Sequence, residues 1–370
     1  MIRISRSGIT PGQRLSFDIF DSQGRVLLLR GEQIASEEQA ELIKQSGFRH
    51  ERTTRLASVF EGISHQSASL AAIEKDFVEH RDRATLIPRI KVLARDLVDV
   101  ADNDPDAAFA NIHLEFVRSY TVVHSFMAAL VSSRLALARG LDRAQRITLV
   151  SAALTHDIGF LARRKGFDAS GDLSAEQRAN IKCHTGDGVQ VLQDLGVDDR
   201  LWLDAVRDHH EYLDGSGYAG KKEGELSLAA RILALADSYS AMLRPRPYRE
   251  RVVARTALET LYVDELARYD GSLLEILIWD FGFYPPGSLL RLANREIAVA
   301  IRNSPGILDS PRVASLTDPH GRPLVRPFAR DTRNPAFAIV DTLDPAMAAR
   351  SAKQIGECWS LDFTAPSARK

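Results

Sequence analysis

The stretch "RAQRITLVSAALTHDIGF", residues 143–160, decides how the middle of the chain is interpreted. Its apolar residues recur at helical spacing and a glycine follows them, so it predicts a helix that ends at Gly159. His156 and Asp157 stand side by side near the end of that helix. This pair is the starting point for a candidate site.

Two more helices are predicted on either side of this one. The earlier helix carries His124, and the later helix carries His184. Ser174 and Gln177 have the spacing of a capping box, which predicts the start of the later helix. The expected helices span 118–140, 143–159 and 174–196, and each ends at a glycine.

The segments that flank these helices have a different pattern of apolar residues and turn signals. Two short apolar runs joined around Gly24, then a helix capped by Ser36 and ended by Gly47, predict a small mixed module. Two helical stripes separated at Pro88 predict a connector or a dimerisation segment. The fold class is therefore mainly α. The expected parts are an N-terminal α/β module (1–60), a helical linker (61–104), a helical bundle (105–286), a β-rich C-terminal extension (287–350) and a polar tail (351–370).

The composition excludes several classes of protein. The formal charge of −1 gives no support to a role in coating nucleic acid polymers. Two cysteines, Cys183 and Cys358, exclude a disulfide framework and a cysteine-rich zinc module. The first residues lack the apolar core of a signal peptide, and no run of about 18 apolar residues follows. We therefore expect a cytoplasmic protein without a membrane anchor.

The spacing of histidines and aspartates in the middle of the chain predicts a metal site. Successive members are separated by roughly one helix and one loop, so an antiparallel bundle would return them to the same level. Imidazole and carboxylate without thiolate suit iron, manganese, nickel or zinc, and an aspartate can bridge two ions. The expected ligands are His124, His156, Asp157, His184, His209, His210 and Asp237.

Single members of this set have simpler interpretations. His124 has apolar neighbours and could be an ordinary hydrogen-bonded core residue. Asp237, in a helix of Leu, Ala and Met, would be costly to bury unpaired, so it either caps a local network or binds metal. The remaining histidines do not belong to this spaced set and are expected at the surface: His50, His65, His80, His113 and His320.

Three stretches in this order resemble the HD-GYP family of bacterial HD-superfamily phosphodiesterases. They are "HDIG" at 156–159, "HHEYLDGSGYA" at 209–219 and "ARILALADSYSAMLRPRPYR" at 230–249. The resemblance covers about 105–290 and implies an HD-type helical bundle. It also implies hydrolysis of the second messenger cyclic di-GMP to pGpG, GMP or both.

The resemblance also assigns roles to individual residues. The seven residues above would hold two divalent ions, Fe or Mn, with Asp157 as the bridging catalytic residue and a metal-activated hydroxide attacking phosphorus. Arg246 and Arg249 match a basic pair that contacts substrate phosphate. The glycine-rich loop, with Gly217 and Tyr218, would approach the substrate or, over 212–220, a signalling partner.

The two acids of the glycine-rich loop have two interpretations. Glu211 and Asp214 either orient the histidines or fix the turn.

Three positions depart from the family pattern. Tyr120 stands where members with three metals have a glutamate, which predicts two ions. Phe160 replaces the lysine of HDIGK, a loss on the order of 10²-fold in rate unless Arg163, Arg164 or Lys165 substitutes. Ala219 replaces the proline of GYP and is expected only to loosen a turn.

Phe160 also motivates an alternative function. The chain could be a weak or inactive member that binds metal and cyclic di-GMP and acts as a receptor or interaction module. A phosphohydrolase for another nucleotide is a third interpretation, because a two-metal clamp is not selective by itself. A homodimer is compatible with the linker segment.

Overall fold

The computed structural model describes most of the chain, with gaps. The expected turn at Gly24, the helix start at Ser174 and both arginines of 246–249 lie outside the described residues. The described residues are 2–3, 9–13, 19–20, 26–28, 32–46, 48–49, 59–114, 118–162, 181–244, 252–304, 306–344 and 358–359.

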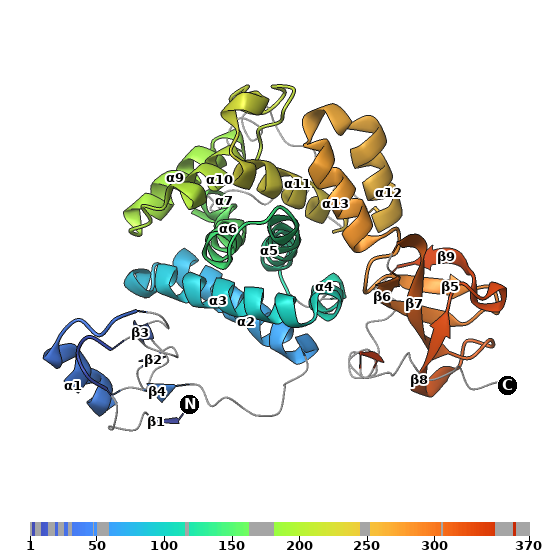
Figure 1. Cartoon of the computed structure of the whole chain (residues 1–370), viewed down its shortest axis with the longest axis horizontal. Helices are drawn as coiled ribbons and strands as arrows, with labels where there is room; N and C mark the ends of the chain where they lie inside the picture. The colour runs from blue at the N-terminus through green and yellow to red at the C-terminus, as the bar shows by residue number, and fades with distance from the viewer. Residues whose placement is uncertain are drawn as a thin grey trace.

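The centre of the molecule is helical, which confirms the mainly α class (Figure 1). Side-chain oxygens cap the starts of several helices, and Asp142 and Gln145 form a complete capping box at the start of α6. The helices are α4 (Pro105–His113), α5 (Tyr120–Ala138), α6 (Arg143–Thr155), α7 (Ile158–Ala162), α9 (His184–Asp194), α10 (Arg200–Asp208), α11 (Leu228–Met242), α12 (Ala254–Glu259) and α13 (Gly271–Phe281), with short helical turns η1 (Glu223–Glu225), η2 (Thr260–Asp264) and η3 (Leu266–Arg268).

The segment predicted as a linker belongs to the core. Helices α2 (Val59–Val78) and α3 (Arg83–Asn103) bury apolar side chains in the same cluster as α5 and α6, so they are not a detached connector. The predicted break at Pro88 is also wrong, because Pro88 lies inside α3. The chain turns instead at 79–82, where His80 and Asp82 adopt positive φ. Burial of Leu86 and Ile90 on either side of Pro88 offsets the hydrogen bond that proline cannot make.

The helix that carries the His156 and Asp157 pair ends earlier than predicted. α6 ends at Thr155, His156 and Asp157 form a turn, and α7 begins at Ile158. Gly159 is therefore not a helix stop. It lies where α7 crosses α9, and a Cβ at this position would come 2.1 Å from the carbonyl oxygen of His184. Only glycine permits this approach, which brings the pair close to the start of α9.

The N-terminal module contains a small antiparallel sheet and one helix. Strands β2 and β3 pair with each other as predicted, and Ser36 caps the helix by accepting from the backbone N–H of Gln39. The sheet order is β1-β4-β2-β3. The elements are β1 (Ile2–Arg3), β2 (Ile19–Phe20), β3 (Val26–Leu28), α1 (Glu37–Ser46) and β4 (Phe48–Arg49).

The C-terminal extension is a five-stranded antiparallel sheet of order β8-β7-β6-β5-β9. Of the predicted polar tail, the structure describes residues 358–359. Cys358 of the predicted polar tail is buried against this sheet, and Trp359 packs beside it. Arg302 on β6 pairs with Asp104 next to α4 and so joins the sheet to the helices. The strands are β5 (Leu289–Leu292), β6 (Ile297–Ser304), β7 (Ile307–Thr317), β8 (Pro323–Asp331) and β9 (Ile339–Leu343), with η4 at Pro335–Phe337.

The junction between α4 and the sheet corrects one prediction about the histidines. His113, expected at the surface, is buried, and its Nδ1 lies 3.2 Å from the carbonyl oxygen of Pro286. His65, His80 and His320 are exposed as expected. His50 lies outside the described residues.

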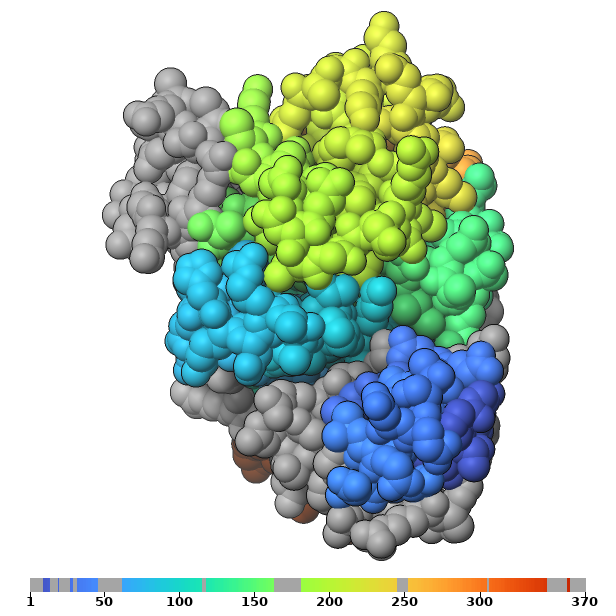
Figure 2. All heavy atoms as spheres, turned by 90° about the vertical axis from the view of Figure 1, so that its left-hand side faces the viewer, coloured from blue at the N-terminus to red at the C-terminus, as the bar shows by residue number. Residues whose placement is uncertain are grey.

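The helices are arranged in layers, and α2 and α3 form one outer layer of the helical centre. Figure 2 shows the cyan surface of α2 and α3 between the blue N-terminal module and the yellow-green surface of α9 and α10. Within the described part of the chain, α5 is long and apolar enough to cross a membrane by composition, but 78% of its apolar window is buried inside the protein.

Candidate metal centre

Four of the predicted ligands form one group, called here the acidic group: His124, His156, Asp157 and Asp237. They come from α5, the turn after α6 and α11. His124 Nε2 lies 2.8 Å from Asp237 Oδ1, and His156 Nε2 lies 3.5 Å from the same oxygen. Asp157 Oδ2 lies 3.6 Å from His156 Nε2 and 4.0 Å from His124 Nε2. Two imidazoles and two carboxylates thus face one small space.

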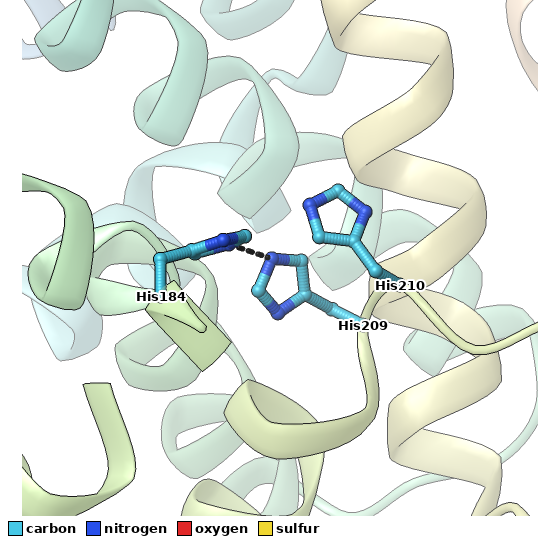
Figure 3. A group of neighbouring side chains, drawn as sticks. All are labelled: His184, His209 and His210. Carbon is cyan, nitrogen blue, oxygen red and sulfur yellow. Dashed lines mark hydrogen bonds between the residues drawn. The ribbon is translucent and has the colours of Figure 1, made fainter. Parts of the chain in front are cut away.

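The other three predicted ligands form the imidazole group: His184, His209 and His210. His184 begins α9, and the other two follow α10. The Nε2 atoms of His184 and His209 are 3.2 Å apart, and Figure 3 shows these two rings pointing toward each other with the His210 ring beside them. The ring centroids of His184 and His210 are 5.1 Å apart.

Asp157 connects the two groups. Its Oδ1 lies 3.6 Å from His184 Nε2, while its Oδ2 faces the rings of the acidic group. His210 Nδ1 in turn lies 3.8 Å from Asp237 Oδ2. The structure therefore brings all seven predicted residues to one place, with a carboxylate between the two clusters of rings. Two sets of side chains have ligand atoms close enough together to hold one ion each. One set is His124, His156 and Asp157, and the other is the imidazole group.

Backbone contacts fix how three of these rings present their nitrogens. The Nδ1 atoms of His156, His184 and His209 each face the carbonyl oxygen three residues earlier. In the neutral ring Nδ1 is then the donor, so Nε2 carries a lone pair. Two lone pairs aimed at each other, as in His184 and His209, repel unless a cation lies between them. This donor set fits metal binding.

His124 differs from these three rings. Its Nδ1 is buried and has no hydrogen-bond partner among the described residues. Its ring stacks on Tyr120, with centroids 5.2 Å apart and an angle of 16° between the planes. Tyr120 thus places an aromatic ring, and no carboxylate, against His124.

The two groups differ in charge. Burial lowers the pKa of His156, but the Asp157 and Asp237 carboxylates outweigh it and raise this pKa to about 9. Burial also opposes ionisation of both aspartates, yet the neighbouring imidazoles hold the pKa of Asp157 and of Asp237 below the ordinary value.

The imidazole group shows the opposite shift. Burial lowers the pKa of His210 to about 4, although Asp237 opposes this, and burial with the rings of His210 and His156 brings the pKa of His209 well below its ordinary value. These rings are held neutral, the form that binds metal.

The glycine-rich loop over the imidazole group is tied down by Glu211. The buried carboxylate of Glu211 accepts the backbone N–H groups of Ala219 (2.6 Å) and Lys221 (3.0 Å). Asp214 Oδ1 accepts the backbone N–H of Ser216. Both acids therefore make contacts that fix the turn, which is the second of the two interpretations given above.

Gly217 and Ala219 have specific places in this loop. A Cβ at Gly217 would come 2.5 Å from Cα of Glu211, so glycine lets the loop close on itself. The expectation that Ala219 only loosens the turn is incomplete, because its N–H donates to Glu211 and proline has no such donor. The loop places the ring of Tyr218 4.7 Å from the ring of His210.

Sequence reasoning missed the ionic support of this loop. Asp208, next to His209, is buried and lies 2.7 Å from Lys221 Nζ and 3.2 Å from Arg207 Nε. The signal available in the sequence is the aspartate directly before the two histidines. Arg246 and Arg249, and the alternative cations Arg163, Arg164 and Lys165, lie outside the described residues.

Comparison with known families identifies the helical centre. Residues 106–273 match the family described as "HD domain". The middle of this chain resembles an HD domain. Together with the quoted motifs and the relatives below, this match supports the predicted membership of the HD-GYP family.

Relatives of the HD domain are enzymes of cyclic dinucleotides. The chain is 29% identical over 228 residues to the cyclic di-GMP phosphodiesterase PA4108 of Pseudomonas aeruginosa, covering 60% of this chain and 54% of the relative. It is 36% identical over 141 residues to the 3'3'-cGAMP-specific phosphodiesterase 3 of Vibrio cholerae, covering 38% and 30%. The chain thus spans about half the length, or less, of these curated relatives.

A solved structure shares the fold. Bd1817, an HDG"Y"P protein from Bdellovibrio bacteriovorus, superposes with a TM-score of 0.51 at 16% sequence identity. The superposition covers 74% of this chain and 97% of that chain. It therefore extends beyond the HD domain itself.

Proposed function

We propose that this chain is a metal-dependent phosphodiesterase that hydrolyses cyclic di-GMP to pGpG, GMP or both. The observation that carries the proposal is the convergence of two ligand groups on Asp157, whose oxygens lie 3.6 Å from His156 and from His184. The relatives named as cyclic di-GMP phosphodiesterases support the choice of substrate.

The resident cofactor in this proposal is a pair of divalent ions, iron or manganese. The acidic group would hold one ion and the imidazole group the other, with Asp157 between them. Imidazole and carboxylate ligands suit both metals. Ions bound there would supply Lewis acidity toward a phosphoryl oxygen and lower the pKa of a bound water.

The chain's own residues prepare this site before any ligand arrives. The carbonyl oxygens of Ala153 and Val206 accept from Nδ1 of His156 and His209 and hold each ring in one orientation, with Nε2 facing the centre. Both rings are fully buried, so water is excluded from their inner faces. Such fixed, desolvated groups favour developing charge more strongly than mobile ones in water.

Substrate contacts are proposed at the rim. Tyr218, partly exposed beside His210, and Gly217 would approach the dinucleotide, and Arg246 and Arg249 would bind its phosphates. The 212–220 loop could also meet a signalling partner. We place the protein in the cytoplasm as part of bacterial signalling.

An assay on the metal-loaded protein tests the proposal. Protein purified without oxygen and loaded with Mn(II) or Fe(II) is incubated with cyclic di-GMP and, separately, with 3'3'-cGAMP, and products are separated by chromatography. We expect cyclic di-GMP to be consumed. Normal metal content with cyclic di-GMP left intact would overturn the proposed activity, and preference for 3'3'-cGAMP would change the substrate.

Phe160 favours a second candidate, a receptor that binds metal and cyclic di-GMP without hydrolysis. Phe160 follows Gly159 on α7 and brings no charge to the corner beside Asp157. Phe160→Lys separates the two candidates, with Val263→Lys at an exposed position of η2 as the matched control. An inert parent that gains activity only with Phe160→Lys supports the receptor, whereas a fast parent removes it.

A further inference from the structure

Several cations close to the glycine-rich loop already have carboxylate partners. Lys221 and Arg207 both pair with Asp208, and Arg268 pairs with Glu265. Their charges are therefore largely compensated before a ligand arrives. A phosphodiester entering beside His210 would gain little from them.

Lys182 differs from these cations. It is exposed, precedes His184 by two residues, and no carboxylate among the described residues pairs with it. Its Nζ lies 5.7 Å from the centroid of the Tyr218 ring. That ring lies 4.7 Å from the ring of His210 and 6.3 Å from the ring of His184. Among the described residues, Lys182 thus contacts an aromatic ring that lies beside the imidazole group, and no carboxylate compensates its charge.

The contact that holds Lys182 is weak enough to exchange. A lysine over a tyrosine at an exposed site is held by a weak cation–π attraction. A charge-assisted hydrogen bond to a phosphate oxygen is stronger. The flexible four-carbon stem of lysine lets Nζ leave the ring without moving the backbone.

The crossing of α7 and α9 brings the chain at Gly159 close to the start of α9, two residues after Lys182. Gly159 touches the carbonyl oxygen of His184, so the residues that follow Gly159 and those that precede His184 lie close together. Phe160 supplies no positive charge on the α7 side of this crossing, whereas Lys182 supplies one in the segment that leads into α9.

We infer that Lys182 is a substrate-binding residue that donates to a phosphate oxygen of the dinucleotide at the imidazole-group side of the centre. This inference rests on the proposed phosphodiesterase function for the identity of the substrate. The binding itself needs only a phosphate group. Tyr218 positions Lys182 in the absence of substrate.

Equilibrium binding to the Mn(II)-loaded full chain tests the inference, with cyclic di-GMP and inorganic phosphate as separate probes. Lys182→Ala is compared with Lys182→Arg, which keeps the charge, and with Lys91→Ala, which removes an exposed lysine from α3. We expect Lys182→Ala to weaken binding of both probes about 10-fold, with Lys182→Arg close to the parent. Manganese content should be unchanged in all variants.

The outcomes separate this inference from the proposed function. Unchanged binding by Lys182→Ala, or an equal loss with Lys91→Ala, overturns the role of Lys182. A parent that neither binds nor hydrolyses cyclic di-GMP, but binds phosphate with dependence on Lys182, overturns the proposed substrate and retains the role of Lys182. A parent that binds neither probe overturns both.

Discussion

The acidic group and the imidazole group meet at Asp157, yet they are built differently. In the acidic group, two carboxylates surround two rings and raise the pKa of His156 to about 9 against the effect of burial. In the imidazole group, burial lowers the pKa of His210 to about 4. A proton on His156 can therefore offset part of the negative charge of the acidic group without metal. The lone pairs of His184 and His209 converge, and His209 and His210 resist protonation, so the imidazole group depends more strongly on a metal cation.

The largest effect is expected when the link between the groups is removed. Asp157→Asn keeps the shape but removes the charge that lies 3.6 Å from both His156 Nε2 and His184 Nε2. We expect hydrolysis of cyclic di-GMP to fall by roughly 10³-fold and the metal content to decrease. Asp198→Asn, at an exposed position, is the control. Full activity in Asp157→Asn would show that the groups act independently.

Chelation tests whether the groups contribute to stability through metal. At a free metal concentration of 100 times the dissociation constant, one bound ion stabilises the folded state by about 2.7 kcal/mol. For a domain of this size the melting temperature should then fall by roughly 5–10 °C on metal removal, as measured by calorimetry. Asp157→Asn should respond less. An unchanged melting temperature in the parent would contradict a built metal centre.

A smaller effect is expected on the free energy of unfolding of the metal-free protein as the pH changes. A rise in pH lowers the contribution of His156 and raises that of His210. The raised pKa of His156 contributes stability that is complete below about pH 6.5 and is lost as pH rises toward 9. The lowered pKa of His210 costs stability as pH falls from about 6.5 toward 4.

Histidine NMR of the metal-free protein measures the two titrations directly. His156 should remain protonated well above pH 7, and His210 should remain neutral well below pH 6. Similar titration of both rings near pH 6.5 would remove the distinction between the groups.

The smallest expected effect concerns the loop over the imidazole group. Ala219→Pro removes the N–H that donates to the buried carboxylate of Glu211, which should cost about 1–2 kcal/mol in the free energy of unfolding. Ala219→Gly retains the N–H and is the matched control. Denaturant unfolding of both variants measures the difference. A proline variant as stable as the parent would mean that this hydrogen bond does not hold the loop.

The sequence predicted which side chains converge more accurately than it predicted where the helices end. Because one helix and one loop separate successive ligands, the spacing predicted their convergence, and the structure brings them together. The helix ends at Gly140 and Gly196 were also anticipated, and both glycines have positive φ. These features are encoded locally.

The errors concern features that depend on tertiary contacts. The end of α6 at Thr155 coincides with a hydrogen bond from Trp202 Nε1 to Thr155 Oγ1, and the role of Gly159 comes from its approach to His184. Periodicity shows that α2 and α3 have buried faces but not which helices cover them. Lys182 shares no motif with Tyr218, and only the fold brings them together.

Counting the metal ions bound per chain tests the central claim most directly. The parent is purified without oxygen, saturated with Mn(II), desalted and subjected to elemental analysis. Two ions per chain are predicted, with the count reduced in Asp157→Asn and unchanged in Asp198→Asn. A parent that retains one ion or none under these conditions would contradict a two-metal centre built from the acidic and imidazole groups.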